Sequence, residues 1–139
     1  MAIVDLYNRI AAVQDIVPAI YKTTQTSTGI DRTAFEGGSD ALVGVLNVGA
    51  WTDGTHTFKL QDSPDNSAWT DVAPALQQGS FVAIAGAGQQ NLPQKVAYSG
   101  IQRYVRVVDT VTGSPVTGAA YGFTWIVGGA HVLPTGSPN

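Results

Sequence analysis

The chain has 139 residues and a mass of 14.5 kDa, the size of a single domain. It contains no cysteine, which excludes a disulfide framework, a thiolate zinc site and thiol catalysis. Its net charge is −3 and only 12% of its residues are charged, whereas nucleic-acid binding needs clustered lysine and arginine. No stretch reaches the roughly 20 apolar residues of a membrane span. We therefore expect a soluble protein that binds neither nucleic acid nor a membrane.

The first 22 residues carry an apolar stripe at close to helical spacing, and Pro18 would end a helix there. The stripe consists of Ile3, Leu6, Tyr7, Ile10, Val13 and Val17. Charged residues at Asp5, Arg9 and Asp15 interrupt it, so we expect no signal peptide and synthesis in a cytoplasm. A short amphipathic helix and an extended arm both fit, because an isolated helix of this length is marginal. The segment could pack on its own domain or reach another subunit.

From Thr23 onward, short β-rich runs alternate with glycine, proline, asparagine and aspartate at the spacing of a sandwich or barrel. The sequence predicts strands near 24–32, 41–48, 55–62, 69–73, 80–85, 94–98, 101–109, 119–127 and 130–133. Turn signals occur at Asp53-Gly54 and at Pro64-Asp65-Asn66. We predict an all-β fold, an antiparallel β-sandwich over residues 23–134. An N-terminal arm or short helix over 1–22 precedes it, and a tail over 135–139 follows.

Two of these runs also indicate where the core lies. The run 41–48 is apolar on both parities, which predicts a central strand with both faces covered. The run 119–127 alternates aromatic with small side chains. Its aromatic face, with Tyr121, Phe123 and Trp125, is expected to be a core face. Its small-residue face would let another sheet or subunit approach closely.

Catalytic and cofactor motifs are missing from the sequence. Neither His56 nor His131 has partners at metal-ligand spacing, and both are expected to be structural or surface residues. The loop 86–91, GAGQQN, lacks the third glycine of a dinucleotide-binding motif. Acidic residues around 62–71 do not follow the spacing of an EF-hand. We therefore expect no enzyme, no metal and no cofactor.

Aromatic residues leave one alternative function open. The side chains of Trp51, Trp69, Tyr98 and Tyr104 would form a sugar-binding platform if they proved exposed and coplanar. A carbohydrate- or cell-surface-binding sandwich is therefore the alternative to a protein-binding module.

The strand at 101–109 contains two arginines in an otherwise apolar run. Its parity places Arg103 with the inward residues and Arg106 outward beside Tyr104. Each arginine could pair with a nearby carboxylate or with a row of carbonyl groups, while the aliphatic part of its side chain covers apolar surface. Alternatively Arg103, Tyr104 and Arg106 anchor an interface, because arginine and tyrosine are enriched at binding hot spots.

Four segments together resemble a group of small tailed-bacteriophage head proteins, the capsid decoration or cement proteins. They are GTHTFKLQDSPDNSAWTDV (54–72), YSGIQRYVRVV (98–108), the glycine-rich final strand ending GGAHVLP (128–134), and the opening DLYNRIAAVQDIVPAIY leading to GIDRTAFEG. The similarity spans nearly the whole chain, and its most specific parts are the hairpin segment and the Gly-x-x-Arg-Tyr-Val-Arg strand.

The resemblance implies a jelly-roll-like sandwich that binds in many copies to the outside of an icosahedral head. Its partners would be the major capsid protein and further copies of itself, as a dimer or trimer, and its location the virion surface. It implies no catalytic residues. A tail or head–tail connector protein is a second possibility within a virion. We also expect that deleting residues 2–18 would weaken incorporation into heads and leave the sandwich folded.

Overall fold

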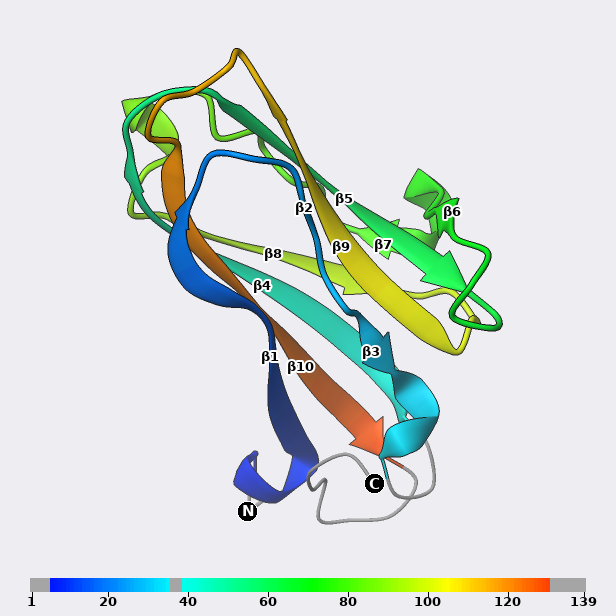
Figure 1. Cartoon of the computed structure of the whole chain (residues 1–139). Coiled ribbons are helices and arrows are strands. Elements are labelled where there is room, and N and C mark those ends of the chain that lie inside the picture. Colours follow the sequence, from blue (N-terminus) through cyan, green and yellow to red (C-terminus); the bar gives the residue numbers. More distant parts are fainter. Residues whose placement is uncertain (1–5, 36–38, 131–139) are drawn as a thin grey trace.

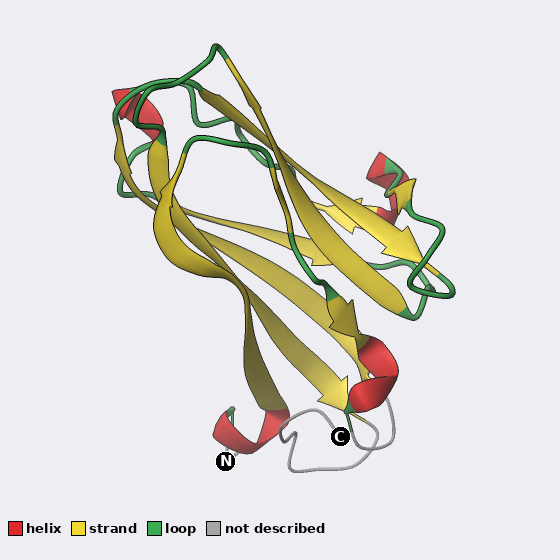
Figure 2. Ribbon diagram, viewed as in Figure 1, coloured by secondary structure: helices red, strands yellow, loops and turns green. Residues whose placement is uncertain are grey.

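The computed structural model describes residues 6–35 and 39–130, and these form two facing antiparallel β-sheets (Figures 1 and 2). Sheet A has the strand order β1-β10-β4-β8-β7, and sheet B has the order β2-β9-β5-β6 with β3 also paired to β9. Sheet A consists of β1 (Ile10–Tyr21), β4 (Ser39–Trp51), β7 (Gln77–Gln78), β8 (Pro93–Tyr98) and β10 (Ala119–Ala130). Sheet B consists of β2 (Gln25–Thr26), β3 (Ile30–Asp31), β5 (Thr55–Ser63), β6 (Thr70–Asp71) and β9 (Tyr104–Thr112). The predicted antiparallel β-sandwich is confirmed, whereas its jelly-roll-like connectivity stays a prediction.

Four single helical turns complete the described secondary structure. They are η1 (Tyr7–Arg9), η2 (Arg32–Ala34), η3 (Pro74–Leu76) and η4 (Ala87–Gln89). Most predicted strands are present within a few residues of their expected bounds. The predicted strand 80–85 is reduced to one bridge between Ile84 and His56, and the strand predicted at 101 begins only at Tyr104. Of the predicted strand 130–133, only Ala130 is described, as the last residue of β10.

The N-terminal segment forms a strand and not a helix. Residues 10–21 pair with β10 as the edge strand of sheet A, and Ile16 enters the core. The carboxylate of Asp15 accepts hydrogen bonds from Trp125 Nε1 at 2.8 Å and from the Gly29 amide at 3.0 Å. Of the two alternatives for this segment, a short helix and an extended arm, residues 10–21 take the extended form, because pairing to β10 satisfies the backbone of a segment rich in β-branched residues. The described part of the segment packs on its own domain.

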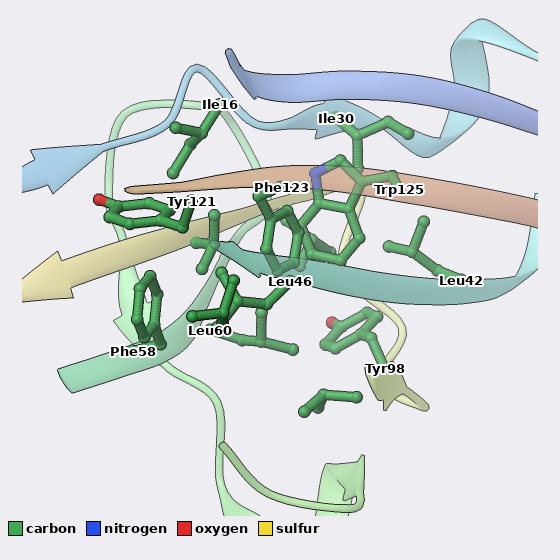
Figure 3. Close-up of a cluster of buried hydrophobic side chains, with 14 of the residues drawn as sticks. Ile16, Ile30, Leu42, Leu46, Phe58, Leu60, Tyr98, Tyr121, Phe123 and Trp125 are labelled. Carbon is green, nitrogen blue, oxygen red and sulfur yellow. The ribbon is translucent and has the colours of Figure 1, made fainter. Parts of the chain in front are cut away.

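The core lies between the sheets and is organised around β10 (Figure 3). Tyr121, Phe123 and Trp125 are all buried, which confirms the predicted aromatic core face. Burying a large apolar side chain contributes roughly 1.5–3 kcal/mol, so this stripe is a principal source of stability. Strand β4 is central in sheet A as predicted, but only one of its faces is buried; Val43 and Val45 on the other face are half-buried.

Both predicted turns are present. Gly54 has a φ of 81°, a conformation that glycine adopts without steric cost, and it connects β4 to β5. The preceding Asp53 accepts hydrogen bonds from the amides of Val116, Thr117 and Gly118, and these bonds hold the pKa of its carboxyl below the usual value. Asn66 has a φ of 61° in the second turn. The hydrogen bonds of Asp53 thus connect the β4–β5 turn to the loop between β9 and β10.

Candidate functional site

The face of sheet A that points away from the core carries two rows of side chains that run across four strands. The strand registers set the members of each row opposite one another. The first row consists of Ala12, Ile126, Val43 and Ala97, and the second of Gln14, Thr124, Val45 and Lys95. We call these eight residues the outer face of sheet A. All are exposed or half-buried, and Lys95 alone is charged.

A shallow hollow of about 490 Å³ continues this face toward the other end of β1. It is lined in part by Pro18, Ile20, Asn47, Gly49, Ala120 and Gly122. A Cβ atom on Gly122 would come within 2.7 Å of Pro18 Cγ, so glycine is required where β1 crosses close to β10. The small-residue face predicted on β10 therefore partly serves to admit β1 of the same chain.

The outer face of sheet B has a different chemistry. It consists of Thr57, Lys59 and Gln61 on β5 with Arg106, Val108 and Thr110 on β9. Its charged and amide groups bond to neighbours within the chain: Lys59 Nζ pairs with Asp71 at 3.0 Å, and Gln61 also donates to Asp71 at 2.8 Å. Val108 on this face is buried, but its polar groups are exposed or half-buried and bond to one another, which suits contact with water.

Arg103, Tyr104 and Arg106, which the sequence predicted as binding residues, lie on the sheet B side. Arg103 donates two hydrogen bonds to Asp31, at 2.9 and 2.8 Å, and its guanidinium lies 4.9 Å from the ring centre of Tyr104. This pairing lowers the pKa of Asp31 to about 2 and raises that of Arg103. The inward orientation expected for Arg103 is wrong, because the strand begins after it and the side chain is exposed.

Arg106 points outward with Tyr104, as predicted from the alternation of the strand. Its guanidinium donates to Gln61 Oε1 at 2.9 and 2.7 Å and stacks 4.2 Å from the ring centre of Trp69. Both arginines thus have partners within their own chain, which agrees with the structural alternative. They lie apart from the outer face of sheet A.

The predicted N-terminal binding residues do not form one surface. Ile3 lies outside the described residues. Leu6 and Tyr7 are exposed before β1, Tyr7 within the turn η1, and Val17 is 62% exposed beyond the middle of the strand. Ile10 is half-buried on the parity of the outer face, whereas Val13 packs against the core. Strand geometry alternates the side chains between faces and so divides the helical stripe.

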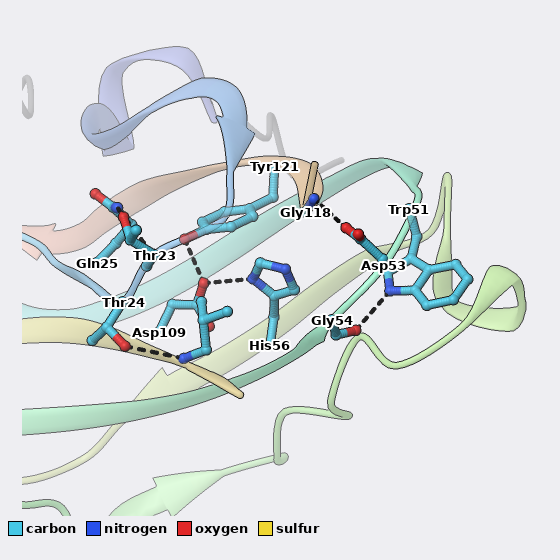
Figure 4. A network of polar contacts seen from close by, with 11 residues as sticks. Thr23, Thr24, Gln25, Trp51, Asp53, Gly54, His56, Asp109, Gly118 and Tyr121 are labelled. Atoms are coloured by element: carbon cyan, nitrogen blue, oxygen red, sulfur yellow. Dashed lines mark hydrogen bonds and ion pairs between the residues drawn. The ribbon is translucent and has the colours of Figure 1, made fainter. Parts of the chain in front are cut away.

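A network of hydrogen-bonded polar side chains lies inside the core (Figure 4). His56 Nδ1 lies 2.8 Å from Asp109 Oδ2, which also accepts a 2.7 Å hydrogen bond from the Tyr121 hydroxyl. Burial raises the pKa of Asp109 above its usual value, and burial together with this carboxylate raises that of Tyr121. His56 and Asp109 are 0% exposed, so no substrate reaches them. The prediction that His56 is structural is consistent with this burial; His131 is outside the described residues.

Three hydrogen bonds join aromatic side chains of sheet A to buried or half-buried aspartate carboxylates. Besides Tyr121–Asp109 and Trp125–Asp15, the Tyr98 hydroxyl donates to Asp62 at 2.7 Å. Sequence analysis did not find these pairs, since their members are 12 to 110 residues apart.

Within the described residues, the metal, sugar and nucleotide sites considered from the sequence lack the geometry that they would need. Within the described parts of the chain, no three histidine or acidic residues are grouped to hold a metal ion, and the acidic residues around 62–71 bond to Tyr98, local amides, Lys59 and Gln61. Trp51 and Trp69 lie near opposite ends of β5, and Tyr98 is buried, so these rings do not form one sugar platform. The loop 86–91 contains only the turn η4. None of the described helices is long and apolar enough to cross a membrane.

A search for related proteins found no matching protein-family model and no matching curated protein.

Proposed function

We propose that this protein is a structural virion protein that decorates the exterior of a tailed-phage head and cements it by bridging neighbouring major capsid proteins. Two lines of argument support the proposal. The first is the resemblance of its four sequence segments to capsid decoration proteins. The second is the chemical contrast between the two outer faces of the sandwich.

This contrast is the observation that carries the proposal. The outer face of sheet A presents mostly aliphatic and small side chains with one glutamine and one lysine, whereas that of sheet B presents mostly polar groups that bond to one another. Charged residues are depleted at the centres of protein interfaces, and contiguous exposed apolar patches mark interaction sites. The face also carries hollows of about 290 Å³, beside Val43, Lys95 and Ala97, and of about 490 Å³, and an extended sheet face of this kind offers area for contact with another protein.

Cementing would follow from multivalency. A contact with one capsomer that is weak by itself becomes durable when the same particle also holds a neighbouring capsomer. The second contact then forms at high effective concentration, and combined affinity can exceed either single affinity by about 10²–10⁴. No chemical step is required.

The proposal is tested with a charge placed on each face. The variant Val43→Lys introduces a cation between Ile126 and Ala97, and Thr57→Lys introduces the same cation on the outer face of sheet B. Each purified variant is added to heads that lack the protein, and bound copies are measured against the major capsid protein. We expect Val43→Lys to lose at least about tenfold in affinity, while Thr57→Lys and wild type bind alike.

Equal binding of all three proteins would refute the role of the sheet A face. Thermal unfolding of each variant must show that both remain folded. The number of copies in purified particles separates the head from other virion locations. Hundreds of copies would support decoration of the head, and about a dozen would place the protein in a tail or connector.

A further inference from the structure

Lys95 is the single charged residue on the outer face of sheet A, and among the described residues its ammonium group has no ion pair or hydrogen bond. The other basic residues of the chain lie elsewhere. Four of them bond to groups of their own chain: Arg32, Lys59, Arg103 and Arg106. The remaining two, Arg9 and Lys22, lie before and after β1. The face proposed to bind a partner therefore carries one uncompensated positive charge.

The side chain of Lys95 lines the hollow of about 290 Å³, together with Val43, Ala97, Gln78 and Gly79. Gln78 on β7 lies opposite Ala97, so it extends the first row of the outer face by one member. Lys95 lies two residues before Ala97 on β8, a diagonal position that long side chains can span. The amide of Gln78 also has no bonding partner in the part of the chain that the structure describes. The hollow thus combines aliphatic walls with two unused hydrogen-bond donors.

Binding of a partner to this face would take Lys95 out of water. An ammonium group that loses its water is stabilised only if an opposite charge and further hydrogen bonds replace it. We propose that the hollow receives an acidic side chain, an aspartate or a glutamate, of the protein to which the outer face of sheet A binds. The inference rests on the proposed function and specifies the partner, because the partner must present a carboxylate opposite Lys95.

The chemistry of the hollow suits a carboxylate at the end of a short aliphatic chain. The methylene groups of the incoming side chain would contact Val43 and Ala97. Its oxygens would accept hydrogen bonds from Lys95 Nζ and from the amide of Gln78. A neutral amide could accept the same hydrogen bonds, but it would leave the charge of Lys95 uncompensated. Because the whole chain carries a net charge of −3, this local attraction also favours the sheet A face over other parts of the surface.

Binding to heads that lack the protein tests the contact. Lys95→Met removes the charge and keeps most of the aliphatic length, Lys95→Arg keeps the charge, and Lys95→Glu reverses it. We expect the affinity to fall at least about tenfold for Lys95→Met and further for Lys95→Glu, and to change by less than about fivefold for Lys95→Arg. Lys22→Glu is the matched control, since it makes the same change in net charge at another exposed lysine, and it should bind like the wild type.

Carbodiimide coupling identifies the partner group directly. The reagent joins an amine to a carboxylate in contact with it as an amide, and takes up the water that is lost. Lys59 and Asp71 of the same chain, 3.0 Å apart, provide an internal control for the reaction. In heads reloaded with the wild-type protein, we expect mass spectrometry to find Lys95 coupled to an aspartate or glutamate of the major capsid protein.

The outcomes separate this contact from the proposed function. If Lys95→Met binds heads as tightly as the wild type, Lys95 stays in water and the acidic contact is overturned, while the proposed function stands. Coupling of Lys59 to Asp71 without any coupling of Lys95 would lead to the same conclusion. If the wild-type protein itself fails to bind heads, the proposed function is overturned and this contact with it.

Discussion

Replacement of Asp109 by alanine tests how much the buried polar network stabilises the fold. One oxygen of Asp109 accepts a hydrogen bond from Tyr121 at 2.7 Å and lies 2.8 Å from His56 Nδ1, and all three residues are buried. The alanine variant leaves two buried polar groups, His56 Nδ1 and the Tyr121 hydroxyl, without this partner. Each such group costs about 1–3 kcal/mol, which gives a loss of about 2–6 kcal/mol. That is a large share of the 5–15 kcal/mol typical of a domain.

Urea unfolding followed by tryptophan fluorescence measures this loss. The neighbouring residue Thr110 is exposed on the same strand, so Thr110→Ala is the matched control and should change the free energy of unfolding by no more than about 0.5 kcal/mol. If Asp109→Ala is as stable as this control, the network contributes nothing and the argument from burial fails.

A double-mutant cycle separates the hydrogen bond from other effects of the substitution. In the wild-type background, Tyr121→Phe removes a bonded hydroxyl and should cost about 1 kcal/mol. In the Asp109→Ala background it removes an unpaired buried hydroxyl, so we expect it to be neutral or stabilising. The same cost in both backgrounds would refute a direct interaction between the two side chains.

The pH dependence of stability gives a further check on Asp109. Its pKa is raised by burial above the unfolded value of 3.8, so the folded state holds the proton more tightly. The stabilisation from this group is therefore fully present below pH 3.8 and is lost as the pH rises through the raised pKa. Asp109→Asn keeps an acceptor oxygen and cannot ionise, and its stability should fall less over this range. An unchanged pH profile would contradict the raised pKa.

Three further predictions concern the backbone and the surface. Gly118→Ala should destabilise the fold by more than about 2 kcal/mol in thermal unfolding, because φ is +96° there and the new Cβ would collide with the Tyr21 carbonyl oxygen. Arg103→Gln should reduce the loss of stability between pH 3.8 and 2, since Arg103 is the largest cause of the low pKa of Asp31, about 2, and the stabilisation from Asp31 disappears as the pH falls through that value. An acid profile identical to wild type would contradict this. Deleting residues 2–18 should unfold the protein by circular dichroism, contrary to the expectation from sequence, because it removes most of β1.

Local features of the sequence were sufficient to predict the sandwich. The alternation of Tyr121, Phe123 and Trp125 with small residues identified a core-facing strand. The turn residues at Asp53-Gly54 and Pro64-Asp65-Asn66 identified two places where the chain reverses direction. These signals act over a few residues, through side-chain alternation and backbone φ. They therefore do not depend on which strand becomes the neighbour.

What the sequence did not determine depends on that neighbour. A short stripe rich in isoleucine and valine fits a helix or a strand, and pairing with β10 decided in favour of a strand. Which side chains join into the mostly aliphatic outer face of sheet A, and which aspartate meets His56, depends on strand register. Register is set by contacts between residues that lie far apart in the sequence, such as Asp15 and Trp125 at 110 positions, and only the folded chain brings those contacts together.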